Sequence, residues 1–99
     1  MTYKLDFYED ALKEWRKLDG TVKDQFKAKL IERLENPKVP SAKLRHATDR
    51  YKIKLKSVGY HLVYEVLDKE IVVVVVAVGK RERNAVYNAA NKRPSRDNQ

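Results

Sequence analysis

Residues 50–56 alternate without a break between basic and apolar side chains. A period of two is typical of a β-strand that has one buried face and one solvated face. The sequence therefore predicts a strand whose apolar residues, Tyr51, Ile53 and Leu55, point into the core. The intervening lysines would form a row on the opposite face, about 6.5–7 Å apart. These lysines are Lys52, Lys54 and Lys56.

A row of ammonium groups with no carboxylates between them repels itself, so it is best explained by a polyanion lying across it. The charge of the whole chain favours the same partner. The 99 residues carry a net charge of +8, and the excess is segregated. Residues 37–61 hold seven cations and one anion, whereas residues 1–36 are balanced. A second basic block, residues 79–99, has a net charge of +4. The simpler alternative is a generally basic surface, which would not need two separate basic blocks.

Length and composition favour one domain, expected to span residues 1–93, with a polar and disordered tail over residues 94–99. The chain has no cysteine, which excludes disulfides and thiolate chemistry. Its longest apolar run is eight residues, whereas a membrane-spanning helix needs about 20. With no signal-like start, the chain is predicted to be cytoplasmic and to have no membrane partner. We expect no metal site and no cofactor.

Two helices are predicted near the N-terminus, after a first strand over residues 3–7. Apolar residues recur at helical spacing over residues 9–18, and again over residues 21–36. Thr21 is a candidate N-cap for the second helix, and Pro37 should end it. The pair is expected to form an αα-hairpin that packs its apolar stripes on a sheet.

The rest of the chain is predicted to form mainly strands. A short strand is expected over residues 42–45, a turn over 46–49, and a return strand over 60–66. Residues 71–78 are continuously apolar and mostly β-branched, as in a central strand. A short helix should follow over residues 82–90.

The connection at Val58 and Gly59 is expected to be a two-residue turn. That turn would set Lys56 opposite His61, on the lysine face.

The order of elements predicts an α+β domain. An N-terminal strand and the αα-hairpin would pack on one face of an antiparallel β-meander, with a short C-terminal helix. The opposite sheet face would stay free for the lysine row.

Clustered cations on such a face suit RNA cleavage. They stabilise the charge that develops on the phosphorus centre, and they lower the pKa of a neighbouring lysine so that it can accept a proton. Arg81 follows the central strand and is placed for bidentate phosphate contacts. Tyr87, on the last helix, could stack on an unpaired base or simply pack against the sheet. Further phosphate-binding candidates are Arg45, Arg50, Lys56, Lys80 and Arg83.

The residues resemble the RelE family of bacterial toxins over about nine-tenths of the chain. The resemblance rests on four separated motifs and on Tyr87. The motifs are ALKEWRKL at residues 11–18, YKIKL at 51–55, GYHLVY at 59–64 and VGKRER at 78–83.

This resemblance implies a microbial-RNase-like fold and a metal-independent mRNA endonuclease that acts in the ribosomal A site, in contact with 16S rRNA. It implies a RelB-like antitoxin that wraps the toxin and displaces its C-terminal helix. It also implies that the complex binds operator DNA as a repressor. By matching position, Lys52 and Lys54 would supply base and phosphate-stabilising functions. Arg81 would act as acid or charge stabiliser, and Tyr87 would hold the nucleotide.

His61 departs from the family pattern, which has arginine at this position. Nearby lysines should push the histidine towards its neutral form, so one hypothesis is that His61 attenuates cleavage. A second hypothesis gives His61 an acid/base role. Two other functions stay open. One is a non-catalytic nucleic-acid-binding module. The other is a toxin of the same fold with a protein target, as in the ParE relatives that poison DNA gyrase.

Overall fold

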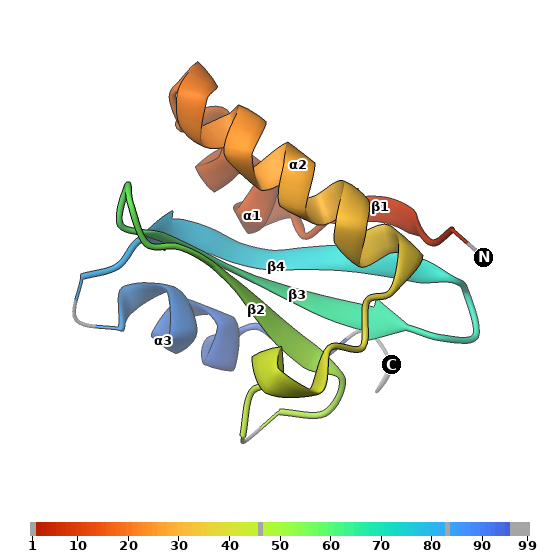
Figure 1. Ribbon diagram of the computed structural model, residues 1–99. Helices are drawn as coiled ribbons and strands as arrows, with labels where there is room; N and C mark the ends of the chain where they lie inside the picture. The colour runs from red at the N-terminus through yellow and green to blue at the C-terminus, as the bar shows by residue number, and fades with distance from the viewer. Residues whose placement is uncertain (1, 46, 83, 96–99) are drawn as a thin grey trace.

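The computed structural model describes residues 2–45, 47–82 and 84–95, and its sheet has the strand order β1-β4-β3-β2 (Figure 1). β2 and β3 are antiparallel, as are β3 and β4, while β1 pairs with β4 in parallel. The α+β class is therefore confirmed. The N-terminal strand was expected to pack on one face of an antiparallel meander, but it is an edge strand of the sheet, and its parallel pairing makes the sheet mixed. The elements are β1 (Lys4–Phe7), α1 (Glu9–Arg16), α2 (Gly20–Glu35), η1 (Pro40–Ala42), β2 (Arg50–Leu55), β3 (Tyr60–Leu67), β4 (Val72–Lys80) and α3 (Ala85–Lys92).

β4 is one of the two inner strands of the sheet and is hydrogen-bonded to a strand on each side, as is β3. Residues 73–78 are fully buried, as expected for a continuous apolar run. The strand begins one residue later than predicted. Ile71 lies in the preceding turn with a φ of 57°, where its N–H donates to the carbonyl of Asp68 at 3.2 Å.

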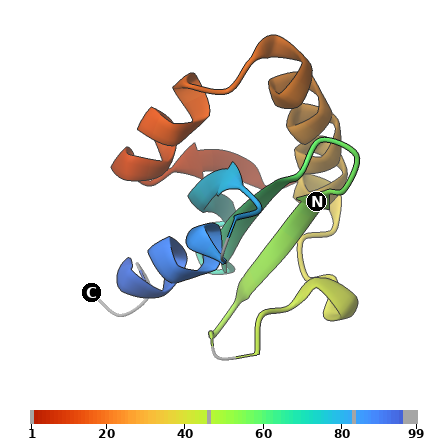
Figure 2. The ribbon, with the colours of Figure 1, turned by 90° about the vertical axis from the view of Figure 1, so that its left-hand side faces the viewer.

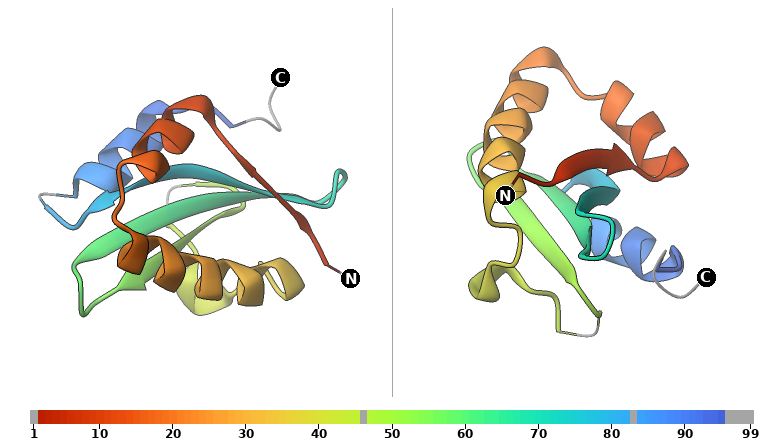
Figure 3. Two further views of the ribbon diagram at one scale, coloured as in Figure 1. Left: turned by 90° about the horizontal axis from the view of Figure 1, so that it is seen from above. Right: turned by 90° about the vertical axis from the view of Figure 1, so that its right-hand side faces the viewer.

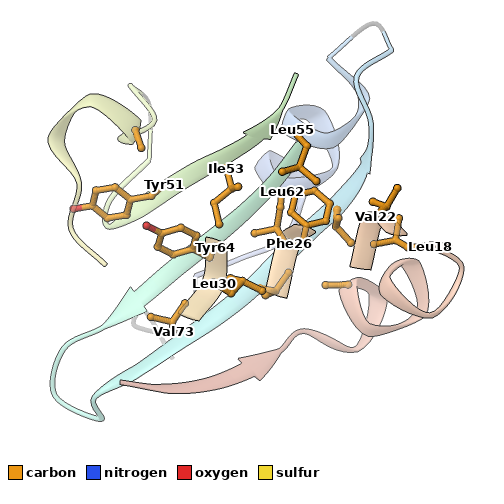
Figure 4. Close-up of a cluster of buried hydrophobic side chains, with 14 of the residues drawn as sticks. Leu18, Val22, Phe26, Leu30, Tyr51, Ile53, Leu55, Leu62, Tyr64 and Val73 are labelled. Carbon is orange, nitrogen blue, oxygen red and sulfur yellow. The ribbon is translucent and has the colours of Figure 1, made fainter. Parts of the chain in front are cut away.

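One face of the sheet is covered by α1 and α2 (Figure 3). Figure 4 shows side chains of α2, such as Phe26 and Leu30, lying against Ile53 and Leu62 of the sheet. α2 is capped at its N-terminus by Asp19 rather than by Thr21, because the Asp19 carboxylate accepts from the N–H of Val22 at 3.0 Å.

The opposite face is not free, and this expectation was wrong. α3 packs there, on the side of the sheet away from α1 and α2 (Figure 2). Val86 and Ala90 of α3 contact a second core of Val63, Val76 and Ala77. A strand that is apolar on both faces needs cover on both faces, and the C-terminal helix supplies it. The part of the face that stays open lies along β2.

The loop between β2 and β3 spans residues 56–59, two residues more than predicted. Lys54, not Lys56, therefore lies opposite His61. Because a shift of two residues preserves the alternation of faces, His61 still shares the face of the lysine row. Lys56 leaves the row and lies in the loop.

The segment before β2 is less regular than a strand. η1 replaces the first residue of the strand predicted over 42–45, and only Lys43 forms a bridge, with Tyr51. Near the C-terminus, Pro94 and Ser95 contact the body: Tyr8 donates to the Pro94 carbonyl at 2.7 Å, and Ser95 donates to Glu65 at 3.0 Å. Within the described residues, no helix is long and apolar enough to cross a membrane.

Candidate nucleic-acid site

An open cleft of about 420 Å³ lies where β2, the chain after η1 and α3 come together. The right-hand view of Figure 3 shows the segment after η1 beside β2. Leu44 fixes that segment, because its N–H donates to the carbonyl of Arg50 at 2.9 Å. The lining residues, Ser41, Lys43, Leu44, Arg45, Lys52, Lys54 and Tyr87, come from three separate parts of the chain.

Lys52 and Lys54 contribute the two strand cations of this cleft. Lys52 is half-buried, and Lys54 is exposed. Burial lowers the pKa of Lys52, and the charges of Lys54 and Arg45 lower it further. A lysine with a lowered pKa has a larger neutral fraction at neutral pH, so it can accept a proton.

His61 lies between the lysines and the end of β4. On β3 it is paired with Lys54 on one side and with Gly79 on the other. The residue is only 8% exposed. Burial is the main cause that lowers the pKa of His61, followed by the charges of Lys54, Arg81 and Lys52. The predicted direction towards the neutral form is confirmed, although burial contributes more than the neighbouring cations.

Arg81 follows directly after β4, and its N–H donates to the carbonyl of Gly59 at 2.8 Å. This bond joins the end of β4 to the β2–β3 loop. Arg81 is exposed, yet its charge acts on His61 together with those of Lys52 and Lys54. The strand lysines and the strand-end arginine therefore lie on one side of the molecule.

Tyr87 brings an aromatic ring from α3 to the same cleft. The ring lies 5.3 Å from the His61 ring, centroid to centroid, in a tilted arrangement. Its hydroxyl is buried and has no hydrogen-bond partner among the residues that the structure describes. Burial raises the pKa of Tyr87, so the hydroxyl stays protonated and able to donate.

Arg50 was expected to bind phosphate, and the structure corrects this. Its guanidinium is buried beneath the C-terminal segment. Nε is 2.9 Å from the Glu65 carboxylate, Nη1 donates to the Ala90 carbonyl at 2.5 Å, and Nη2 donates to the Arg93 carbonyl at 2.7 Å. Arg50 lies on the predicted face of β2, but α3 covers that end of the face.

The other predicted phosphate ligands differ in placement. Arg45 lines the cleft. Lys56 and Lys80 are exposed at the same end of the sheet, in the β2–β3 loop and at the end of β4. Arg83 lies outside the described residues. The sequence did not predict Ser41, Lys43 or Leu44 as residues of the site. Lys43 nevertheless belongs to the basic block of residues 37–61, which indicated an anionic partner.

A partly buried hydrogen-bond network links β2 to α2 and to the chain at Pro37. Arg33 of α2 donates to the backbone carbonyl of Lys52 at 3.2 Å and to the Tyr64 hydroxyl at 2.9 Å. Tyr64 in turn donates to the Pro37 carbonyl at 2.7 Å and stacks on Tyr51. The network therefore fixes the backbone from which Lys52 projects. Within the described part of the chain, no group of three or more acidic or histidine side chains could hold a metal ion.

The fold and the cleft define a small α+β domain with a concentrated cationic, aromatic-edged surface. Comparison with known proteins places the chain in a family of such small domains. The family described as ParE toxin of type II toxin-antitoxin system, parDE, matches residues 5–85. The mRNA interferase toxin RelE of Escherichia coli (strain K12) is 59% identical over 93 residues, which cover 94% of this chain and 98% of the relative.

Solved structures give the same result. Escherichia coli RelE carrying two arginine-to-alanine substitutions, in the free state, has a TM-score of 0.88 at 56% identity and covers 96% of this chain and 100% of its own. The RelE chain of the intact Escherichia coli RelBE toxin–antitoxin complex has a TM-score of 0.79 at 59% identity, covering 82% of this chain and 99% of its own. The chain belongs to the RelE family of toxins of type II toxin–antitoxin systems.

Proposed function

We propose that this chain is an endoribonuclease that cleaves mRNA in the ribosomal A site and thereby inhibits translation. The observation that carries this proposal is that Lys52, Lys54 and Tyr87 line one cleft. His61 lies beside it, with its ring against Tyr87, and the charge of Arg81 reaches His61 together with those of the two lysines. The curated relative is named an mRNA interferase toxin. Cationic groups held in place around a phosphate stabilise the charge that develops during transesterification.

In the proposed reaction Lys52, in its neutral form, accepts the proton of the 2′-hydroxyl. The 2′-oxygen then attacks the adjacent phosphorus, and the bond to the 5′-oxygen breaks. Lys54 and Arg81 stabilise the charge on the non-bridging oxygens, and the 5′-oxygen takes up a proton from a water molecule of the solvent as it leaves. A reference pKa above about 12 makes Arg81 a charge stabiliser in this scheme rather than the acid. The reaction needs no metal or cofactor.

The ribosome would supply the orientation that the small cleft lacks. The cleft is open and has few acid/base groups, so it holds a flexible RNA loosely by itself. A substrate fixed by the A site, with 16S rRNA beside the toxin, gains the advantage of a unimolecular geometry. Such a substrate implies that the toxin acts in the cytoplasm.

A RelB-like antitoxin is the proposed regulatory partner. Relatives are solved as a RelBE complex and with an antitoxin RelBc peptide. α3 carries Tyr87 and covers the second core. An antitoxin segment that displaces α3 would remove Tyr87 from the cleft and bury the exposed apolar surface itself. The complex would also bind operator DNA and repress its own operon.

Ribosomes programmed with a defined mRNA test this function directly. Primer extension should map a cut within the A-site codon, and naked mRNA should be cut far more slowly. Preincubation with the antitoxin should abolish the cut. Uncut mRNA on programmed ribosomes would contradict the endoribonuclease assignment. Because the matching family is described as ParE toxin, inhibition of DNA gyrase supercoiling is the second activity to assay.

His61→Arg should raise the single-turnover cleavage rate about tenfold, which corresponds to about 1.4 kcal/mol of transition-state stabilisation. The substitution replaces a side chain whose pKa is lowered, and which is therefore neutral, with a permanent cation and a planar donor fork. His61→Gln is the control, since it stays neutral and should leave the rate unchanged. A large loss in His61→Gln, with an ionisation in the wild-type profile below about pH 6.5, would instead favour an acid/base role.

A further inference from the structure

The last helix, α3, has little apolar surface with which to hold the sheet. It has eight residues, and Val86 and Ala90 are the two that are buried. Both side chains are small, so docking removes only a limited apolar area from water. A helix shorter than about 12–15 residues is also marginal in water by itself. The docked position of α3 therefore depends on polar contacts.

Arg93, the residue that follows α3, makes the strongest of these contacts. Its guanidinium is bidentate to the carboxylate of Glu14 in α1, with Nη1 2.9 Å from Oε1 and Nη2 3.1 Å from Oε2. Nη1 also donates to the carbonyl of Val76 in β4 at 2.6 Å. The Arg93 side chain is only 17% exposed, and its hydrogen bonding to Glu14 raises the pKa of Arg93. Bidentate charged pairs of this kind are among the stronger hydrogen-bonded contacts in proteins.

The same two side chains complete an edge of β4. β1 pairs only with the first half of β4. Farther along β4, Glu14 Oε1 accepts from the N–H of Val78 at 3.2 Å, and Arg93 takes the carbonyl of Val76. The pair therefore joins α1, β4 and the end of α3 at one point, with backbone groups of the sheet as part of the network.

The backbone after α3 is held at the same place. The carbonyl of Arg93 accepts from Arg50 Nη2 at 2.7 Å, and the carbonyl of Pro94 accepts from the Tyr8 hydroxyl at 2.7 Å. α3 is therefore fastened to the body at its C-terminal end. Tyr87, on the same short helix, keeps its place in the cleft only while this end is fastened.

We propose that Arg93 is a positioning residue, which forms with Glu14 a latch that keeps α3 on the sheet and Tyr87 in the cleft. The proposal rests on the proposed nuclease function for the role of Tyr87. α3 exchanges between a docked and a released position, and the latch sets the ratio of the two. Because α1 supplies Glu14, a change in α1 alters a cleft on the other face of the sheet.

Amide hydrogen exchange on the full chain tests the latch without any substrate. Arg93→Met and Glu14→Gln should each speed exchange over residues 88–92 about 10- to 100-fold, as expected for loss of hydrogen bonds to a charged group. Exchange in β3 should change far less, because α3 opens locally while the sheet stays folded. Lys92→Met is the matched control, since Lys92 is exposed in the last turn of α3, and it should stay within about twofold of the wild type.

The double variant Glu14→Gln with Arg93→Met tests whether the two residues act as a unit. Each single substitution already breaks the pair, so exchange in the double variant should be no faster than in the faster single variant. Wild-type exchange in Arg93→Met, or effects that multiply in the double variant, would overturn the latch.

The His61 ring reports whether Tyr87 leaves the cleft. The two rings lie 5.3 Å apart, centroid to centroid, and burial is the main cause that lowers the pKa of His61. Release of α3 in Arg93→Met should expose the imidazole and raise its pKa towards 6.5, while the charges of Arg81 and the cleft lysines remain. NMR titration of the imidazole measures this. An unchanged His61 titration would contradict release of Tyr87.

Cleavage on programmed ribosomes tests whether the latch acts through Tyr87. Arg93→Met should cut at least about threefold more slowly, because a helix this short is held by a small free energy of docking. In a Tyr87→Ala background the same substitution should have no further effect. A further loss there, or unchanged cleavage in Arg93→Met, would overturn the positioning role. Faster exchange of α3 in Arg93→Met, with no RNA cleavage by the wild type, would support the latch and refute the nuclease function.

Discussion

Lys52→Ala is expected to lower the single-turnover rate of mRNA cleavage by about 100- to 10,000-fold, the range typical for loss of a general base. Lys52 is the cleft lysine whose pKa is lowered, mainly by burial and then by the charges of Lys54 and Arg45. A lower pKa enlarges the neutral fraction that can accept the 2′-hydroxyl proton. The rate is measured by primer extension on programmed ribosomes with toxin in excess.

The conservative variant Lys52→Arg distinguishes a lysine that acts as a general base from one that acts only through its positive charge. Lys52→Arg keeps the charge but cannot lose its proton near neutral pH, so it should be as slow as Lys52→Ala. Retention of most of the rate in Lys52→Arg would show that Lys52 acts only by its charge. Lys29→Ala is the control, because Lys29 is exposed on α2, which covers the face of the sheet opposite the cleft.

The pH dependence of the rate has a definite sign. The neutral form of Lys52 is the active one, so the rate should rise with pH until the pKa of Lys52 is passed. That pKa lies below the usual 10.5. Lys54→Ala removes a neighbouring positive charge, which should raise the pKa of Lys52 and move the rise to higher pH. An unchanged profile in Lys54→Ala would contradict the coupling of the two lysines.

The sequence predicts which face of the sheet each side chain of a strand occupies. This depends only on whether the residue stands at an odd or an even position along the strand. Tyr51, Ile53 and Leu55 are buried and Lys54 is exposed, as the alternation indicated. The loop before Tyr60 proved longer than predicted, but a change of two residues leaves every side chain on its face. The shared face of the lysines and His61 was therefore predictable, while the partner of His61 was not.

The cover on the second face could not be predicted from local pattern. A run of valines indicates that both faces of β4 are buried, but it does not say which element covers the second. Arg50 shows the consequence. It continues the alternation of the lysines, and only the tertiary position of α3 makes it a buried residue. Its partner, Glu65, lies on the neighbouring strand in direct register, in a segment that otherwise reads as apolar.

Arg50→Met should lower the free energy of unfolding by about 3–5 kcal/mol, the usual cost of breaking a buried ion pair on one side. The Arg50 and Glu65 side chains are 6% and 0% exposed, so the remaining carboxylate would be buried without its partner guanidinium. The carbonyls of Ala90 and Arg93 would lose a charged donor as well. Urea unfolding followed by circular dichroism measures the loss, and Arg16→Met, at an exposed arginine, should stay within about 0.5 kcal/mol.

The double variant Arg50→Met with Glu65→Leu tests whether the ion pair mainly stabilises the whole fold or mainly holds the end of α3 in place. Apolar replacement of both partners of a buried pair is often neutral or stabilising, so global stability should return to near the wild-type value. The end of α3 should nonetheless stay loose, because the guanidinium bonds to the Ala90 and Arg93 carbonyls are still missing. Amide exchange over residues 88–92 should be faster than in the wild type, and cleavage slower, since α3 holds Tyr87 in the cleft. Wild-type exchange and cleavage in the double variant would mean that apolar packing of Val86 and Ala90, together with the Arg93–Glu14 pair, is enough to dock the helix.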